Sequence, residues 1–264
     1  MTVGHSLLTA KPGATNPGSH RQPLSMKTLA SADHGLTGSG LWRAAFDKAA
    51  AAFGLIVLMP VFVAAAIAVA ISDGFPVLFR QRRVGRWGRP FEVLKFRSMR
   101  LGRPGAGITI DGDTRVTRVG RLLRQYKIDE LPQLWNVLRG DMSLIGPRPM
   151  PPAYVNQSDI SWQRVLSVRP GITDLASLIY RDEERLLAAR QDPERYHKEH
   201  IIPDRLTLNL HYMNTRCFRK DLSLLFWTVW YSIFSKQFDA ESIRRRFLAG
   251  APGSRSTDET GNDS

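Results

Sequence analysis

The sequence has little cysteine and little histidine. Cys217 is the single thiol among 264 residues, which excludes an intrachain disulfide and a metal site built from several cysteines. Of the six histidines, only His197 and His200 have the i, i+3 spacing of neighbours on one helical face. Two metal ligands without a third favour a surface pair over a metal centre.

Acidic residues are also in the minority. The chain has 24 Asp and Glu against 37 Lys and Arg, a formal net charge of +13. This excess predicts anionic partners, namely phosphate groups, nucleic acid or an acidic membrane surface. The charge alone does not choose among them.

The two ends of the chain lack a sustained apolar pattern. Residues 1–40 are rich in Gly, Ser, Pro and Thr, and residues 248–264 are polar, so both are predicted to be disordered tails. The apolar run begins too late for a secretory signal. Between the tails we expect a membrane segment at 41–73 and a cytosolic domain at 74–247.

The membrane segment is predicted from a charge-free apolar stretch, Ala49 to Ile71. It is long enough to cross a bilayer as a helix, which takes about 20 apolar residues. Pro60 interrupts its middle, and a proline there kinks a helix. Basic residues flank both ends, which opposes moving either flank across the membrane. We therefore predict a re-entrant segment that enters and leaves on one side. A buried core helix of a soluble domain is the alternative.

Two short strands follow, at Val77–Phe79 and Phe91–Phe96, with glycines between them that suit a turn. Most arginines around them are expected to be solvated beside anionic lipid headgroups. Lys95 and Arg97 stand at the end of the second strand, where a side chain can be held firmly enough to bind a diphosphate.

Further along, residues 117–126 predict a basic amphipathic helix. Its inward positions are Val119, Leu122, Leu123 and Tyr126. Arg124 on this helix stands five residues before Asp129, close enough to help a phosphate reach it. Apolar helices are also predicted at 206–213 and 221–234, and the second is equally consistent with the membrane interface and with a packed core.

The densest group of reactive side chains lies between Arg124 and Pro149. We predict a helix from Glu130 to Arg139 with Asp129 as its N-cap. A helix N-terminus favours ionised carboxylates. An ionised Asp129 is then a candidate nucleophile at phosphorus, and Glu130 a candidate Mg²⁺ ligand. Ordinary helix initiation explains the acid pair more simply if the local pattern is taken alone.

Several ordered blocks resemble one family, the bacterial initiating sugar transferases, which are monotopic polyprenyl-phosphate phosphoglycosyl transferases. The resemblance covers residues 43–235. The blocks are Phe46-Asp47, the Pro60 break, Pro76-Val-Leu-Phe-Arg-Gln81, Lys95-Phe-Arg-Ser-Met99, Asp129-Glu-Leu-Pro-Gln-Leu-Trp-Asn-Val-Leu-Arg-Gly-Asp-Met-Ser-Leu-Ile-Gly-Pro-Arg-Pro149 and Val168-Arg-Pro-Gly-Ile-Thr173. The chain departs from better-known members at Asp174–Ser177 and resembles a minimal form without a multispan N-terminal half.

The resemblance implies transfer of a sugar phosphate from a UDP-sugar to undecaprenyl phosphate with Mg²⁺. It makes Asp129 the covalent nucleophile, and Glu130, together with Asp129, the metal ligand. It assigns the phosphates to Lys95, Arg124, Arg148 and Arg181. The position of Arg97 after the second strand adds it to the substrate-binding candidates. The expected fold is α/β and membrane-associated, a re-entrant helical hairpin with a small, mostly helical catalytic domain containing short strands. The expected location is the cytoplasmic face of the bacterial inner membrane.

Two rival functions stay open at this stage. A membrane-tethered nucleic-acid binder would suit the charge, but the arginine clusters lack interleaved exposed aromatics, so we expect no nucleic-acid partner. A Mg²⁺-dependent lipid-phosphate phosphatase would release inorganic phosphate and need no nucleotide sugar. Membrane lipids are expected partners, and a homodimer stays an option. The sequence does not specify the sugar or the glycan.

Overall fold

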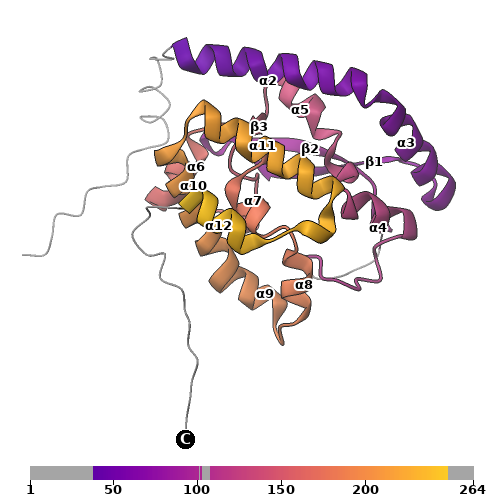
Figure 1. The fold of residues 1–264 in the computed structure, drawn as a ribbon. Helices are drawn as coiled ribbons and strands as arrows, with labels where there is room; N and C mark the ends of the chain where they lie inside the picture. Colours follow the sequence, from indigo (N-terminus) through magenta and orange to yellow (C-terminus); the bar gives the residue numbers. More distant parts are fainter. Residues whose placement is uncertain (1–37, 101, 103–107, 249–264) are drawn as a thin grey trace, which may run out of the picture.

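The computed structural model describes residues 38–100, 102 and 108–248. The two predicted tails lie outside the described residues except at their inner edges. The described part is mostly helical with a few short strands, as predicted (Figure 1).

Two consecutive helices cover one side of the molecule (Figure 1). Helix α2 spans Gly38–Val57 and α3 spans Met59–Asp73, with Leu58 between them. The pair is bent by 62°. Pro60 lies in the first turn of α3, where its missing N–H costs no helical hydrogen bond. The predicted break is therefore confirmed, at Leu58 to Pro60.

Within the described residues, no single helix is long and apolar enough to cross a membrane. The bent pair formed by residues 40–57 and 59–73 meets that test when its two helices are taken together.

A hairpin follows the bent pair. Strand β1, Leu78–Val84, pairs antiparallel with β2, Pro90–Phe96, so that Leu78 lies opposite Phe96. The turn contains the short 3₁₀ helix η2, Arg86–Gly88. This confirms the predicted hairpin, although β1 runs five residues beyond its predicted end at Phe79.

A second, two-stranded sheet joins distant parts of the chain. Strand β3, Ser143–Ile145, pairs in parallel with β4, Gly171–Thr173. The backbone segments at Gly146, just after β3, and at Gly171 approach closely. A Cβ on Gly171 would lie 2.0 Å from the backbone nitrogen of Gly146. Only glycine fits there. This contact fixes the start of the loop that carries Arg148.

The remaining helices surround these two sheets and bury one main core, which includes Val137, Leu175 and Leu224. They are α4 Arg118–Gln125, η3 Ile128–Glu130, α5 Gln133–Arg139, η4 Pro152–Tyr154, α6 Ile160–Leu166, α7 Leu175–Ile179, α8 Glu183–Ala188, α9 Pro193–Tyr196, the π-helical η5 His197–Ile201, α10 Ile202–Thr215, α11 Phe218–Ile233, η6 Ser235–Gln237 and α12 Ala240–Leu248.

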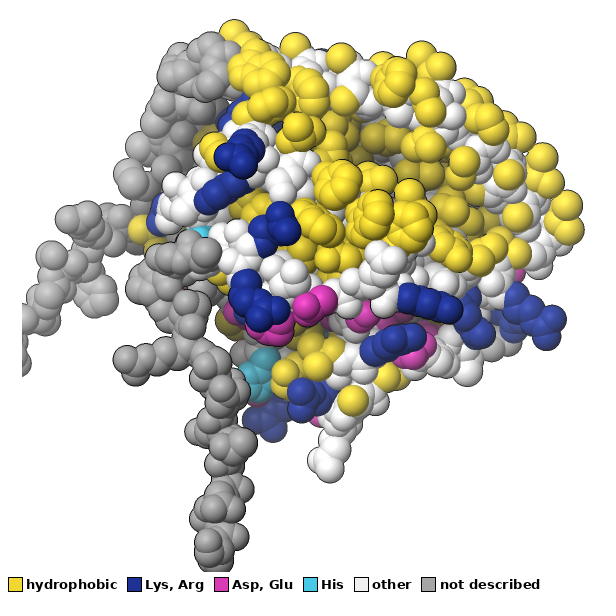
Figure 2. Space-filling model, viewed as in Figure 1, with side chains coloured by type: hydrophobic (Ala, Val, Ile, Leu, Met, Phe, Trp, Pro, Cys, Tyr) yellow, Lys and Arg dark blue, Asp and Glu magenta, His cyan; other side chains and the backbone are white. Residues whose placement is uncertain are grey.

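Helix α11 is apolar on two sides. It buries Leu224 and Tyr231 in the core, so the predicted alternative of a packed core helix is correct for this side of α11. It also exposes a stripe at helical spacing, Leu222, Phe226, Val229 and Ile233, each more than half exposed. Figure 2 shows hydrophobic side chains gathered over α2, α3 and α11. We call this surface the apolar face; its exposed residues are Leu41, Trp42, Phe46, Phe53, Ile56, Val57, Met59, Val61, Val63, Ile67, Ile71, Leu222, Phe226, Val229 and Ile233.

Helix α4 differs from its prediction. Leu123 is buried as expected, but Leu122 is 55% exposed and Tyr126 is 39% exposed. The helix is only eight residues long, and it turns Gly120 toward the backbone of Ser98. A Cβ on Gly120 would lie 2.0 Å from the Ser98 carbonyl oxygen, so this contact sets the inward face.

Polar contacts tie α2 to the rest of the molecule. The Ser143 hydroxyl donates to Asp47 at 2.6 Å, and Arg43 forms an ion pair with Asp221 of α11 at 3.1 Å. Gly54 of α2 packs against Leu134 of α5, where a Cβ would lie 3.3 Å from the leucine. The first apolar helix is therefore held at a defined place over the sheets and the cavity beneath it.

Candidate active site

All seven residues predicted for the site line one cavity of about 1000 Å³. They are Lys95, Arg97, Arg124, Asp129, Glu130, Arg148 and Arg181. The lining also includes Leu58 and Val61 at the α2–α3 bend, and Val229 and Ile233 of α11. The cavity is thus charged in one part and apolar where it meets the apolar face.

The acid pair is not at the start of a long helix. Lys127 has a left-handed backbone (φ 57°), and Ile128–Glu130 then form the 3₁₀ turn η3. Helix α5 begins only at Gln133, after Pro132. The predicted start of this helix at Glu130, with Asp129 as its N-cap, is therefore wrong, whereas its predicted end at Arg139 is confirmed. The tight turn after Lys127 buries both carboxylates, and Asp129 Oδ1 has no hydrogen-bond partner among the described residues.

Glu130 is held by two cations. Lys95 Nζ lies 2.9 Å from Glu130 Oε1, and Arg148 donates to both carboxylate oxygens, with Nη1 at 3.1 Å from Oε2. Burial alone would raise the pKa of Glu130, but the charges of Arg148 and Lys95 hold that pKa well below its ordinary value. Glu130 is therefore ionised.

Asp129 behaves in the opposite way. Burial, together with the negative charge of Glu130, raises the pKa of Asp129. The charges of Lys95, Lys127 and Arg124 oppose this rise. The predicted preference for the ionised form is therefore weakened for Asp129, whereas Glu130 keeps it. Two adjacent carboxylates have pKa values driven apart by their surroundings, as in many acid pairs that do chemistry.

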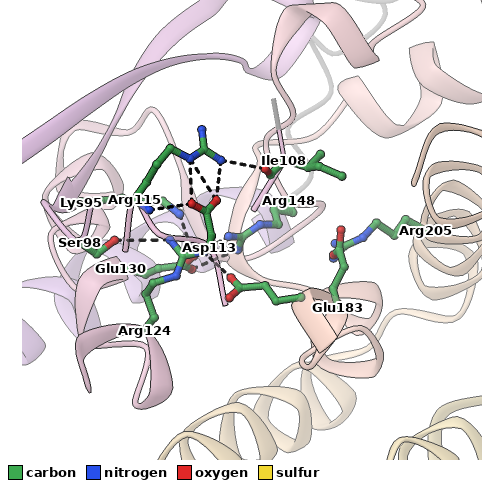
Figure 3. Close-up of polar contacts among 11 residues, drawn as sticks. Lys95, Ser98, Ile108, Asp113, Arg115, Arg124, Glu130, Arg148, Glu183 and Arg205 are labelled. Carbon is green, nitrogen blue, oxygen red and sulfur yellow. Dashed lines mark hydrogen bonds and ion pairs between the residues drawn. The ribbon is translucent and has the colours of Figure 1, made fainter. Parts of the chain in front are cut away.

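Three predicted cations come together near Glu130 from separate elements (Figure 3). Lys95 comes from β2, and Arg148 comes from the loop after β3. The backbone N–H of Arg148 donates to Asp174 Oδ2 at 2.7 Å, which holds this loop in place. Arg124 comes from α4, where it contacts Ser98 Oγ at 3.4 Å and forms an ion pair with Glu184. These three cations meet only because β2, α4 and the loop after β3 pack together.

Arg97 and Arg181 line the cavity, but their guanidinium groups have other partners. Arg97 donates to the carbonyl oxygens of Asp73 and Gly74, so it closes the end of α3. Arg181 donates to Asp182 at 3.1 Å and to the Gln125 carbonyl oxygen at 3.4 Å, and it lies over the Phe238 ring. The structure does not bring these two groups to Glu130.

Sequence reasoning missed Arg83. It lies on β1, donates to the Pro149 carbonyl oxygen at 3.3 Å and lines the cavity. Burial and the nearby charge of Arg148 lower the pKa of Arg83 to about 10. Strand alternation could have separated it from its neighbour Arg82, which is exposed.

His197 was also misjudged. It is 5% exposed, whereas a surface pair with His200 was expected. Its Nε2 lies 3.1 Å from Glu183 Oε1, and Glu183 also pairs with Arg205 of α10. All three residues line the cavity. The π-helical turn at His197–Ile201 shifts the register there, which the i, i+3 count did not include.

The carboxylates of Asp129 and Glu130 are the oxygen ligands nearest to hand for a Mg²⁺ ion in this cavity. In the described part of the chain, no group of three or more His, Cys, Asp or Glu could hold a metal ion. Mg²⁺ bound with a phosphorylated substrate, however, commonly uses only one or two carboxylates together with phosphate oxygens. Asp129 Oδ1 is free of other partners and Glu130 is ionised, so the pair fits such a shared site.

The sequence was also compared with known proteins. The bacterial sugar transferase family matches residues 39–235. The chain belongs to this family. It is 37% identical over 194 residues, 72% of this chain and 68% of the relative, to a UDP-glucose:undecaprenyl-phosphate glucose-1-phosphate transferase of Caulobacter vibrioides.

Two other members of the sugar transferase family are longer than the matched part. A UDP-N-acetylgalactosamine-undecaprenyl-phosphate N-acetylgalactosaminephosphotransferase of Aeromonas hydrophila is 43% identical over 141 residues, 51% of this chain and 33% of the relative. An undecaprenyl-phosphate glucose phosphotransferase of Komagataeibacter xylinus is 37% identical over 205 residues, 74% of this chain and 36% of the relative. The match spans about a third of each of these two relatives.

Proposed function

We propose that the protein transfers a sugar 1-phosphate from a UDP-sugar to undecaprenyl phosphate and releases UMP. The observation that carries this proposal is the buried pair Asp129 and Glu130 in one cavity with Lys95, Arg124 and Arg148. The names of the relatives supply the substrates. Phosphoryl transfer depends on positioning and charge neutralisation, which these side chains provide.

The chemistry proceeds in two displacements at one phosphorus. First, a carboxylate oxygen of Asp129 bonds to the phosphorus that carries the sugar, and the bond from that phosphorus to the bridging oxygen breaks. UMP leaves with that oxygen and its electron pair. Second, an oxygen of undecaprenyl phosphate attacks the same phosphorus and the bond to Asp129 breaks. The product is an undecaprenyl diphosphate sugar, and the carboxylate is restored.

The neighbours of Asp129 have separate tasks in these steps. Arg148 and Lys95 neutralise the ionised Glu130 and turn further N–H groups toward the phosphates. Arg124 and Arg83 add positive charge on the cavity wall. Bound Mg²⁺, held by Glu130 and Asp129, would neutralise phosphate charge.

The lipid substrate is reached through the apolar face. The proposed orientation places the bent pair α2–α3 in the cytoplasmic leaflet of the bacterial inner membrane, entering and leaving on the same side. The stripe on α11 would lie at the same level. Because Leu58, Val61 and Val229 line the cavity, the prenyl chain of the acceptor would lie along them while its phosphate faces the cations.

The test is UMP release by the purified protein in lipid vesicles that contain undecaprenyl phosphate, with a panel of UDP-sugars. We expect one or a few sugars to release UMP only when both the lipid phosphate and Mg²⁺ are present. Inorganic phosphate released without any UDP-sugar would instead establish a phosphatase. Salt-sensitive DNA binding without UMP release would establish the nucleic-acid function.

A further inference from the structure

A second polar cluster lines the cavity beyond Arg148. Glu183 opens α8, His197 lies in η5 and Arg205 lies on α10, so three elements build it. His197 Nε2 lies 3.1 Å from Glu183 Oε1, and Arg205 pairs with Glu183 Oε2. In the view of Figure 3, Arg148 lies between Arg124 on one side and Glu183 and Arg205 on the other. The side chain of Glu183 is thereby fixed at both of its oxygens.

Glu183 remains charged and has spare acceptor capacity. Burial alone would raise its pKa, but Arg205 and His197 lower the pKa to about 2. An ionised carboxylate offers about four acceptor positions, and its two partners here use about half of them. The side chain is 20% exposed and lines the cavity. Glu183 therefore presents a fixed, unshared pair of acceptor positions to whatever occupies this part of the cavity.

The charge of Glu183 restricts the occupant. A carboxylate repels phosphate, so a phosphate group is placed by the cations near Asp129 and not here. An ionised acceptor suits an uncharged group with hydrogen-bond donors, and the hydroxyl groups of a sugar are such donors. Glu183 and Arg148 line the same cavity, and the charge of Glu183 contributes to raising the pKa of that guanidinium. The occupant of this part of the cavity therefore lies on the side where Arg148 binds the phosphates. In a nucleotide sugar, two such neighbours carry hydroxyl groups, the hexose on one side and the ribose on the other.

We propose that Glu183, oriented by His197 and Arg205, accepts hydrogen bonds from hydroxyl groups of the UDP-sugar and selects donors by the presence of those hydroxyls. The inference rests on the proposed transferase function and adds a recognition residue to it. Glu183 is here a specificity residue with no part in bond breaking. His197 and Arg205 are positioning residues that hold its carboxylate.

The experiment couples a change in the protein to a change in the substrate. The kcat/KM of UMP release is measured for wild type and E183Q with the preferred UDP-hexose, with its 2-, 3-, 4- and 6-deoxyhexose analogues, and with the same donor built on 2′-deoxyuridine. For the contacted hydroxyl, its removal should lower kcat/KM of wild type by about 10- to 100-fold, because a hydrogen bond to a charged acceptor is lost. The same removal should lower that of E183Q by less than about 3-fold. Loss with a deoxyhexose assigns the hexose, and loss with the deoxyuridine donor assigns the ribose.

A matched control is E199Q. Glu199 also pairs with an arginine, Arg195 at 3.0 Å, but both side chains are more than half exposed and neither lines the cavity. E199Q should keep the wild-type response to every analogue. If E183Q does not fold, as judged by its thermal unfolding, E183D replaces it, since that variant keeps the charge for Arg205 and His197 and withdraws the acceptor.

Two results would overturn the proposal, and they are distinct. If wild type releases UMP but each deoxy analogue loses the same factor in wild type and in the Glu183 variant, the cluster is a structural ion network and the transferase function stands. If wild type releases no UMP from any UDP-sugar, the proposed function fails and this inference fails with it.

Discussion

The apolar face and the charged part of the cavity lie on the same molecule and are built in opposite ways. The apolar face consists of many side chains from α2, α3 and α11 that each remain exposed, among them Phe53 at 69% and Ile71 at 81%. The charged part concentrates its chemistry in a few buried groups, with Asp129 5% exposed and Glu130 8% exposed. The apolar face depends on small contributions from many side chains, whereas the charged part of the cavity depends on a few specific contacts.

This difference predicts how each region responds to mutation. Apolar burial is roughly additive in area, so one residue of the apolar face contributes a small share. Removing one partner from a buried ion cluster leaves an uncompensated charge, which costs far more. Single changes should therefore be severe in the cavity and mild on the apolar face.

The largest effect should come from D129N. The amide cannot attack phosphorus, so transfer should fall by at least about 1000-fold. The stability of the fold should increase, because a desolvated carboxylate next to Glu130 is replaced by a neutral group of equal shape. We expect a gain of about 1 kcal/mol in unfolding free energy. UMP release measures the transfer rate, and thermal unfolding measures the stability. Full activity would remove Asp129 from the mechanism.

Next is E130Q, which leaves Lys95 and Arg148 without their shared carboxylate. Loss of one partner in a buried ion cluster should lower the free energy of unfolding by about 3 kcal/mol. The variant should also need more Mg²⁺ for half-maximal activity. A denaturant titration and a Mg²⁺ titration at fixed UDP-sugar give the two values. An unchanged Mg²⁺ requirement would reject the metal role of Glu130.

R148K should have an intermediate effect. An ammonium group cannot reproduce the two-pronged grip of a guanidinium on Glu130 or on a phosphate, so kcat/KM should fall by about 30-fold. The matched control is R139K, because Arg139 pairs with Asp141 at 3.4 Å and its side chain is 62% exposed. Equal activities of the two variants would mean that Arg148 contributes charge alone.

On the other side of the comparison, the bend of α2–α3 tests the proposed topology. The double change M59L/P60A should restore helical continuity and convert part of the population into a spanning form. The measurement is labelling of A30C in a C217S background by a membrane-impermeant reagent on intact cells. The parent should be unlabelled and the double variant labelled in part. Labelling of the parent to the same extent would establish a spanning helix.

The smallest effect should come from L222Q on the exposed stripe of α11. Because Leu222 is 53% exposed, we expect a change of less than about 0.5 kcal/mol in stability and a modest loss of membrane recovery. L224Q, two residues along the same helix, changes a fully buried side chain and should cost about 3 kcal/mol or more. Similar stabilities of the two variants would contradict the division of α11 into a core side and an outer side.

The same division explains what the sequence could predict. The bend at Pro60 and the hairpin of β1 and β2 follow from proline chemistry and from local strand patterns, and both are confirmed. The start of α5 was misplaced by three residues, because the left-handed backbone at Lys127 gives no clear signal in the sequence. The exposure of Leu122 and Tyr126 depends on how closely Gly120 approaches Ser98, which no local pattern contains.

Within the cavity, residues identified from ordered motifs were easier to predict than their partners. Lys95, Arg148 and Glu130 were each named from the sequence, but the pairing of both cations with Glu130 requires β2 and the loop after β3 to meet at η3. Arg83 and Glu183 were missed for the same reason. Their importance comes from neighbours far along the chain, and a single sequence does not give those distances.

The central claim is that Asp129 carries the sugar phosphate between donor and acceptor. The most direct test is the intact mass of the protein after mixing with the preferred UDP-sugar in the absence of undecaprenyl phosphate. We predict one added hexose phosphate per molecule, an equal burst of UMP, and a modified peptide that contains Asp129, with none of these in D129N. UMP released at the wild-type rate by D129N, or turnover to the lipid product with no mass increase on any time scale of the reaction, would contradict it.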